Sequence, residues 1–204
     1  MKHRPTKERT MNTQQATMAF KPCNHSVCTW WKGYFFDNWL RRLIHDPSKI
    51  VGPHIKKDMH VLDLGCGMGF FSLAMAKMVG ENGSVTSIDL QEQMLSVLSK
   101  RARKRSLGER IRTHRCCSKS LDISTQADFA LACWMVHEVP NIPIFFQDVY
   151  EQLKPGARFL VLEPKGHFSA KEFEQEKQAA RDAGFTVEQG PKAAMSYSML
   201  LTKS

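Results

Sequence analysis

The residues best suited to chemistry form one short segment, in which Gly65, Gly67 and Gly69 alternate with other residues and Asp63 precedes them. An apolar run leads into these glycines and a helical pattern follows them, which is where parallel sheets bind nucleotide-like ligands. Glycines permit a sharp turn, and a ligand can approach their main chain because no Cβ stands in the way. The segment therefore predicts a ligand-binding loop.

A dinucleotide is the first ligand to test against this loop, and the spacing excludes it. Counting from Gly65, Phe70 stands where the G-x-G-x-x-G fingerprint requires its third glycine, and counting from Gly67 the same place holds Ser72. A second acidic residue, Asp89, ends the next expected strand. A carboxylate there can accept hydrogen bonds from both hydroxyls of a ribose. The ligand we expect thus has a ribose but no diphosphate.

The elements that must position these residues alternate between strand and helix. Strands are expected at 59–64, 84–89, 111–116, 127–134, 158–163, 185–188 and 196–202, and helices at 69–79, 91–105, 142–153 and 169–183. Strands separated by helices predict an α/β fold with a parallel sheet and helices on both faces. The last two strands have too short a connection for a crossover helix, so they should pair antiparallel.

The organisation along the 204 residues is one domain with an extension. Residues 58–204 are expected to form the domain, and residues 21–57 a helical extension, because apolar residues recur at helical spacing in 30–44. Residues 1–20 lack periodicity and predict a disordered basic tail. No apolar run approaches the roughly 20 residues of a membrane helix and no signal peptide is visible, so a cytoplasmic protein is expected.

The formal charge of +9 is concentrated in the tail and in residues 100–112, which hold seven basic residues and one acidic residue. Such a patch suits nucleic acid or an anionic surface, or it is a solvated helix end. The six cysteines predict free thiols. Cys23 and Cys28 match no standard zinc spacing, and we expect no metal.

The glycine segment with Asp63 and Asp89 resembles motif I and the following acidic loop of class I S-adenosylmethionine-dependent methyltransferases. The similarity to the ubiquinone-biosynthesis type (methyltransferase types 11 and 25) continues at 127–139 and at Leu153-Lys154-Pro155-Gly156. It implies a Rossmann-like, seven-stranded, mostly parallel sheet in the order 3-2-1-4-5-7-6. The last strand would be antiparallel, helices would cover both faces, and an N-terminal helix would be added.

The same resemblance implies S-adenosyl-L-methionine as cofactor and S-adenosyl-L-homocysteine as product. Asp63 is placed to favour the cofactor's ammonium through water, and the N–H groups that open the next helix suit its carboxylate. Ser118 stands where the family often has an acidic residue for the adenine. The implied cofactor-binding residues are Asp63, Gly65, Cys66, Gly67, Gly69, Asp89, Leu90, Cys117, Ser118, Cys133 and Trp134. In the N-terminal extension, Trp30, Trp31 and Tyr34 are candidates for a lid over the substrate.

Methyl transfer is an in-line displacement that depends on positioning and at most one base. His137 is the first candidate for that base, since imidazole titrates near neutrality, and Glu163 is the second. The leading interpretation is an enzyme, a monomer or homodimer, that methylates a small molecule. The alternatives are an RNA or protein methyltransferase that uses the basic patch, a metalloid methyltransferase that uses Cys23, Cys28 and the adjacent Cys116 and Cys117, and a non-catalytic cofactor-binding module.

Overall fold

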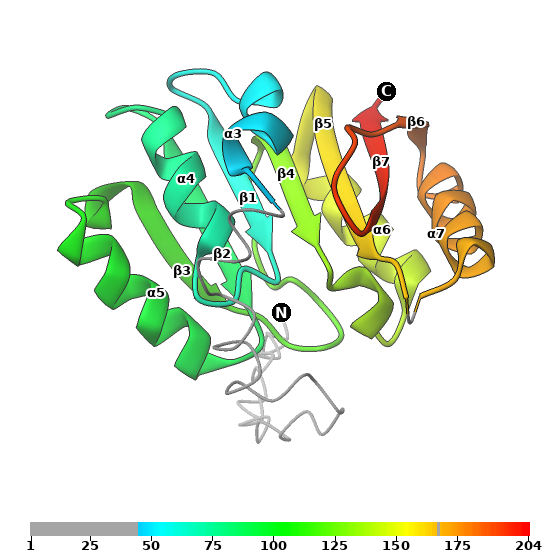
Figure 1. The fold of residues 1–204 in the computed structure, drawn as a ribbon, viewed down its shortest axis with the longest axis horizontal. Coiled ribbons are helices and arrows are strands. Elements are labelled where there is room, and N and C mark those ends of the chain that lie inside the picture. Colours follow the sequence, from blue (N-terminus) through cyan, green and yellow to red (C-terminus); the bar gives the residue numbers. More distant parts are fainter. Residues whose placement is uncertain (1–44, 167) are drawn as a thin grey trace, which may run out of the picture.

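The computed structural model describes residues 45–166 and 168–204. Three sequence-based predictions therefore lie outside the described residues: the tail at 1–20, most of the helical extension at 21–57, and the lid candidates Trp30, Trp31 and Tyr34. The same holds for Cys23 and Cys28. The remainder forms one sheet with helices packed against it (Figure 1).

The sheet contains seven strands in the order β3-β2-β1-β4-β5-β7-β6. The strands are β1 (His60–Leu64), β2 (Ser84–Asp89), β3 (Ile111–Arg115), β4 (Ala127–Cys133), β5 (Leu153–Pro164), β6 (Phe185–Gln189) and β7 (Ser196–Lys203). β1 to β5 pair in parallel, and β7 is antiparallel to both β5 and β6. The order and the single reversed strand confirm the expected Rossmann-like topology.

The helices cover both faces of the sheet, which also confirms the prediction (Figure 1). They are α3 (Pro47–Ile50), α4 (Phe70–Met78), α5 (Glu92–Lys104), α6 (Ile142–Gln152) and α7 (Ala170–Asp182), with 3₁₀ turns η1 (Gly52–His54), η2 (Gly108–Arg110) and η3 (Val136–Glu138). Because side chains alternate along a strand, Val61 packs in one core with α3, α4 and α5, and Leu62 packs in the other with α6 and α7.

β5 differs from its prediction, because it begins at Leu153 rather than at Arg158. The preceding helix ends at Gln152, one residue before its predicted end, and the chain continues as a strand through Lys154-Pro155-Gly156. Gly156 has a φ of 75°, and the pairing register of β4 with β5 shifts between Ala127 and Phe129. The Pro-Gly pair is therefore part of an irregular strand, where a glycine accepts the backbone conformation that the irregularity requires.

The parallel strands end at one edge of the sheet, so the loops after β1, β2, β3 and β4 gather there. Within 45–166 and 168–204, no helix is long and apolar enough to cross a bilayer.

Candidate functional site

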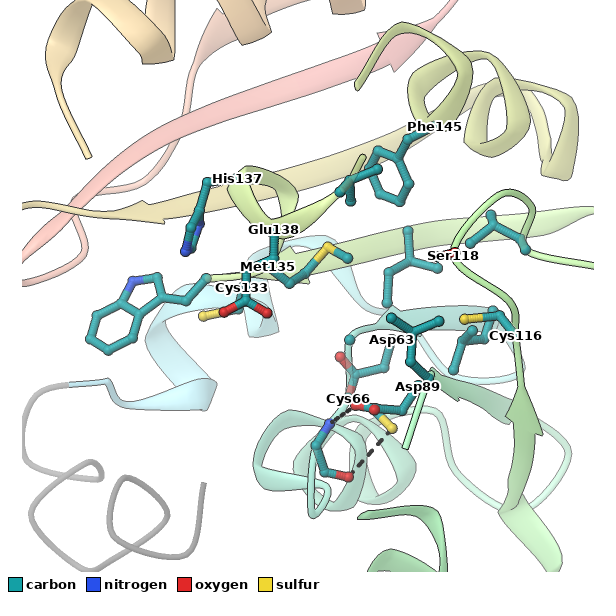
Figure 2. Close-up of a pocket in the computed structure, with 18 of the residues that line it drawn as sticks. Asp63, Cys66, Asp89, Cys116, Ser118, Cys133, Met135, His137, Glu138 and Phe145 are labelled. Carbon is teal, nitrogen blue, oxygen red and sulfur yellow. Dashed lines mark hydrogen bonds between the residues drawn. The ribbon is translucent and has the colours of Figure 1, made fainter. Parts of the chain in front are cut away.

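A cavity of about 560 Å³ lies at this edge (Figure 2). The loop between β1 and α4 forms one side of it, and the ends of β2 and β3 continue that side. The opposite side is made by the loop after β4 and the start of α6, with contributions from the segments at Lys165 and Met195. The cavity occupies the place where the glycine segment predicts a ligand.

The three glycines of the loop at 65–69 all have a positive φ, but they are needed for two different reasons. A Cβ on Gly65 would lie 2.7 Å from Cγ of Met135, and a Cβ on Gly69 would lie 2.1 Å from Cδ1 of Leu98. A Cβ on Gly67 would meet no described atom within 4 Å. Gly65 and Gly69 thus permit close packing, whereas Gly67 borders open space that a ligand can fill.

Asp89 is held at the end of β2 by main-chain donors. Its Oδ2 accepts a hydrogen bond from the N–H of Gly67 at 2.9 Å, and its Oδ1 accepts one from the N–H of Gln91, also at 2.9 Å. Burial raises the pKa of Asp89, and the N–H groups of Gln91, Gly67 and Leu90 act in the opposite direction. Each oxygen keeps a second lone pair, so the carboxylate can accept two further hydrogen bonds from a ligand.

Asp63 and Cys66 complete this side of the cavity. The buried carboxylate of Asp63 accepts a hydrogen bond from the hydroxyl of Ser72, in the first turns of α4. Burial, followed by the charges of Asp63 and Asp89, raises the pKa of the Cys66 thiol well above its ordinary value. Cys66 is therefore a neutral thiol and serves as an apolar wall.

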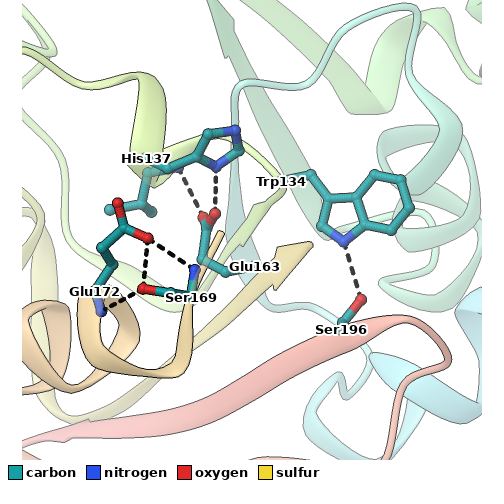
Figure 3. A network of polar contacts seen from close by, with 7 residues as sticks. Trp134, His137, Glu163, Ser169, Glu172 and Ser196 are labelled. Atoms are coloured by element: carbon teal, nitrogen blue, oxygen red, sulfur yellow. Dashed lines mark hydrogen bonds and ion pairs between the residues drawn. The ribbon is translucent and has the colours of Figure 1, made fainter. Parts of the chain in front are cut away.

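His137 and Glu163 form a hydrogen-bonded pair on the other side (Figure 3). Glu163, at the end of β5, is fully buried; one of its oxygens contacts Nδ1 of His137 and the other accepts the N–H of Val136 at 2.9 Å. Burial of the imidazole disfavours its charge, but the Glu163 hydrogen bond and the charges of Glu163, Glu138 and Glu172 outweigh this and raise the pKa of His137. Nδ1 is thus the ring nitrogen that Glu163 engages, and His137 lines the cavity.

Most of the predicted site residues meet in this cavity. Its lining includes Asp63, Gly65, Cys66, Gly67, Asp89, Leu90, Cys117, Ser118, Cys133, Trp134 and His137. Gly69 is not among the lining residues, because it packs against Leu98. Glu163 lies behind His137 rather than on the surface of the cavity.

Sequence reasoning missed two serines that support the site. Ser72 hydrogen-bonds Asp63, and the hydroxyl of Ser196 accepts the indole N–H of Trp134 at 2.9 Å (Figure 3). Ser72 is a polar residue on the buried face of the predicted helix, and that position was the signal that it needs a buried hydrogen-bond partner. Ser196 lies 62 residues after Trp134, and no local pattern joins them.

One part of the cavity lining is apolar, among polar side chains such as Glu138, Asn141 and Asp148. Met135, Val139, Ile144 and Phe145 form it together with Met195. Ile144 and Met195 are 50% and 60% exposed, and they are the exposed large apolar side chains of the described part of the chain. Exposed apolar side chains that gather at one cavity indicate a surface that an apolar molecule covers.

Two arginines of the basic patch at 100–112 make contacts within the fold. Arg101 donates to the carbonyl of Met68, and Arg110 donates to the carbonyl of Ala76 and pairs with Glu81.

The four described cysteines, Cys66, Cys116, Cys117 and Cys133, all line the cavity as free thiols. In 45–166 and 168–204, no group of three or more His, Cys, Asp or Glu side chains is arranged to hold a metal ion.

Comparison with known proteins gives the following similarities. Residues 55–196 match a family described as a methyltransferase domain. A demethylmenaquinone methyltransferase of Symbiobacterium thermophilum is 31% identical over 135 residues, which are 66% of this chain and 51% of that protein. A 2-phytyl-1,4-naphtoquinone methyltransferase of Synechococcus elongatus is 35% identical over 106 residues, 50% of this chain and 45% of that protein. The chain thus spans about half the length of these relatives.

The fold is also that of solved structures. A structure from Aquifex aeolicus, described as a SAM-dependent methyltransferase, aligns with a TM-score of 0.75 and 24% identity. The alignment covers 86% of this chain and 98% of that one. This similarity supports the Rossmann-like architecture independently of the sheet order.

Proposed function

The chain belongs to the methyltransferase-domain family, and from this premise we propose that it binds S-adenosylmethionine in the cavity and methylates a small molecule. The observation that carries the proposal is the space beside Gly67, bordered by the carboxylate of Asp89. A side chain at position 67 would extend into the cavity. Because position 67 is a glycine, that space can hold a ribose. The residues present therefore fit an adenosyl ligand.

The cofactor residues divide by the part of the ligand that each suits. Asp89 accepts hydrogen bonds from the ribose diol, and Asp63, fixed by Ser72, favours the ammonium. Leu90, Cys117 and Ser118 line the cavity near the ends of β2 and β3, where the adenine would lie. We assign Cys66, Cys133 and Trp134, which also line the cavity, to the surroundings of the sulfonium. When bound, the cofactor supplies a methyl group on a cationic sulfur.

We propose His137 as the general base and Glu163 as its partner. Glu163 holds the proton of His137 at Nδ1, so Nε2 carries the lone pair that would accept a proton from an acceptor hydroxyl. Because Glu163 is fully buried and also bonded to the N–H of Val136, the imidazole is held in one orientation. A fixed base of raised pKa accepts a proton from a weakly acidic hydroxyl more readily than a free imidazole does.

We propose a hydroxylated ring of the quinol type as the acceptor. Two relatives are named for methylating demethylmenaquinone and a phytyl naphthoquinone. The apolar wall formed by Met135, Val139 and Phe145 suits such a ring, and His137 suits its hydroxyl. Removal of the hydroxyl proton makes the oxygen and the neighbouring ring carbon nucleophilic. The base and the apolar wall therefore serve the same acceptor.

The test is transfer of labelled methyl from S-adenosylmethionine to a short-chain 1,4-naphthoquinol, with total RNA and a protein extract as competing acceptors. We expect label in the quinol fraction. Label in RNA or protein would show that the acceptor is a macromolecule and not a quinol. Binding of S-adenosylhomocysteine without any transfer would favour a non-catalytic module.

A further inference from the structure

Two bulky residues of the cavity wall have an unusual backbone conformation. Among the described residues, five non-glycine residues have a positive φ. Asp58, Ser106 and Asp122 are small and polar, which eases this conformation, but Trp134 (φ 61°) and Met195 (φ 55°) are not. Both line the cavity. Strain of this kind persists where the surroundings fix a residue, and it gathers at functional sites.

Contacts with distant parts of the chain fix Trp134. Its backbone N–H donates to the carbonyl of Leu162 in β5 at 2.8 Å, and its indole N–H donates to Oγ of Ser196 at 2.9 Å (Figure 3). The ring of His45 meets the indole edge to face at 4.9 Å between centroids. The conformation of Trp134 is therefore set by tertiary contacts rather than by its neighbours in sequence.

Ser196, the residue after Met195, hydrogen-bonds both Trp134 and the carbonyl of Ala194. Its hydroxyl accepts from Trp134 and donates to the carbonyl of Ala194 at 3.2 Å. Nε2 of His45 lies 3.1 Å from the same carbonyl and 3.3 Å from Oγ of Ser196. The carbonyl of Met195 accepts the N–H of Lys165 at 2.7 Å, so this segment is also tied to the end of β5. We call His45, Trp134, Met195 and Ser196 the corner cluster.

Trp134 also controls where the general base stands. It is the first residue after β4, and the turn η3, which carries His137, begins two residues later. The left-handed conformation at 134 sets the direction in which the chain leaves the sheet. Any rotation there moves His137, and in-line displacement loses rate steeply when the reacting groups are misplaced.

We propose that Ser196 is a positioning residue, which holds Trp134 as a wall of the cavity where the sulfonium and the acceptor meet, and thereby aims His137 at the acceptor hydroxyl. This inference rests on the proposed function. It assigns Ser196 and Trp134 to the geometry of the reaction, not to the affinity for the cofactor's adenosine.

The test compares Ser196→Ala with Ser196→Thr and Ser198→Ala. Ser198 is a matched control, because it is buried on the same face of β7 and its hydroxyl has no hydrogen-bond partner in the described part of the chain. With the short-chain naphthoquinol as probe, Ser196→Ala should lower kcat about tenfold. The Kd of S-adenosylhomocysteine should change less than about twofold. Ser196→Thr, which keeps the hydroxyl, should restore most of the rate.

A spectroscopic measurement separates this inference from the proposed function. The indole N–H resonance of Trp134, assigned with Trp134→Phe, should shift in Ser196→Ala and stay in place in Ser198→Ala, and it requires no turnover. An unchanged resonance, or equal kcat in the two alanine variants, overturns the positioning role. A wild-type protein that binds no S-adenosylhomocysteine counts against the proposed function, while the resonance still tests the hydrogen bond.

Discussion

The two sides of the cavity are built in different ways. The side formed by residues 65–69 and Asp89 is held by hydrogen bonds from main-chain N–H groups, such as that from the N–H of Gly67 to the carboxylate of Asp89. The opposite side is held by side chains from distant segments, as in the pairs His137–Glu163 and Trp134–Ser196. We infer that the first side can be common to many enzymes of this fold, whereas the second can change with the acceptor without disturbing the first.

The largest predicted effect is a loss of catalytic rate without a loss of cofactor affinity, on substitution of a residue on the second side. His137→Ala should lower kcat by about 10²-fold or more, since general-base catalysis contributes that much, and it should leave the Kd of S-adenosylhomocysteine unchanged. His60→Gln is the control, because His60 lies at the opposite end of β1 from the cavity. A loss of cofactor affinity in His137→Ala would contradict the separation.

The pH dependence of kcat sharpens the same point. The base must be neutral, and the pKa of His137 is raised by Glu163 against the effect of burial. The rate should therefore rise with pH through a midpoint above the ordinary value of 6.5. Glu163→Gln removes the charge, so its midpoint should move to lower pH. An unchanged midpoint in Glu163→Gln would show that Glu163 does not raise the pKa of the base.

The cofactor side should respond in the opposite way. Asp89→Ala removes the acceptor for two ribose hydroxyls, and two charge-assisted hydrogen bonds correspond to about 100-fold in Kd for S-adenosylhomocysteine by calorimetry. Asp128→Ala is a matched control, because Asp128 accepts the N–H of His60 at 2.8 Å at the other edge of the sheet. Equal affinities of the two variants would remove Asp89 from the site.

Substitution of Gly67 should mainly lower cofactor affinity, whereas substitution of Gly69 should mainly lower stability. Gly69→Ala places a Cβ 2.1 Å from Leu98 and should lower the free energy of unfolding by about 2–3 kcal/mol. Gly67→Ala meets no described atom, so it should cost only the strain of the positive φ, about 1 kcal/mol, yet it should weaken cofactor binding about tenfold. Denaturant unfolding and calorimetry measure the two effects. Equal losses of stability would show that both glycines serve packing alone.

The smallest predicted effect concerns Glu176, which is buried in α7 and has no hydrogen-bond partner in the described part of the chain. Burial, with the charges of Glu163 and Glu172, raises its pKa from 4.5 to about 9. The folded protein therefore keeps a proton that the unfolded chain loses, so the contribution of Glu176 to stability is greatest below pH 4.5 and falls as pH rises towards 9.

Glu176→Gln removes this titration. Its unfolding free energy should fall less between about pH 6 and pH 7 than that of the wild type, by about 1 kcal/mol. Denaturant unfolding at the two pH values measures the difference. Parallel slopes in the two proteins would show that Glu176 does not retain its proton in the folded state.

The contrast between the two sides also explains what the sequence could predict. The strand at 84–89 matches β2 residue for residue, and the turn at 65–69 lies where the glycine spacing places it, because both depend on local pattern. The contact of Trp134 with Ser196 spans 62 residues, and that of His45 with Ser196 spans 151. Such pairs leave no periodicity, and the positive φ of Trp134 opposes its local preference.

The central claim is tested most directly by equilibrium dialysis of labelled S-adenosylhomocysteine against the whole chain, with NAD as competitor. We predict saturable binding at one molecule per chain that NAD does not displace, because the loop lacks the third glycine of a dinucleotide site. Displacement by NAD, or the absence of saturable binding by folded protein, would contradict the account.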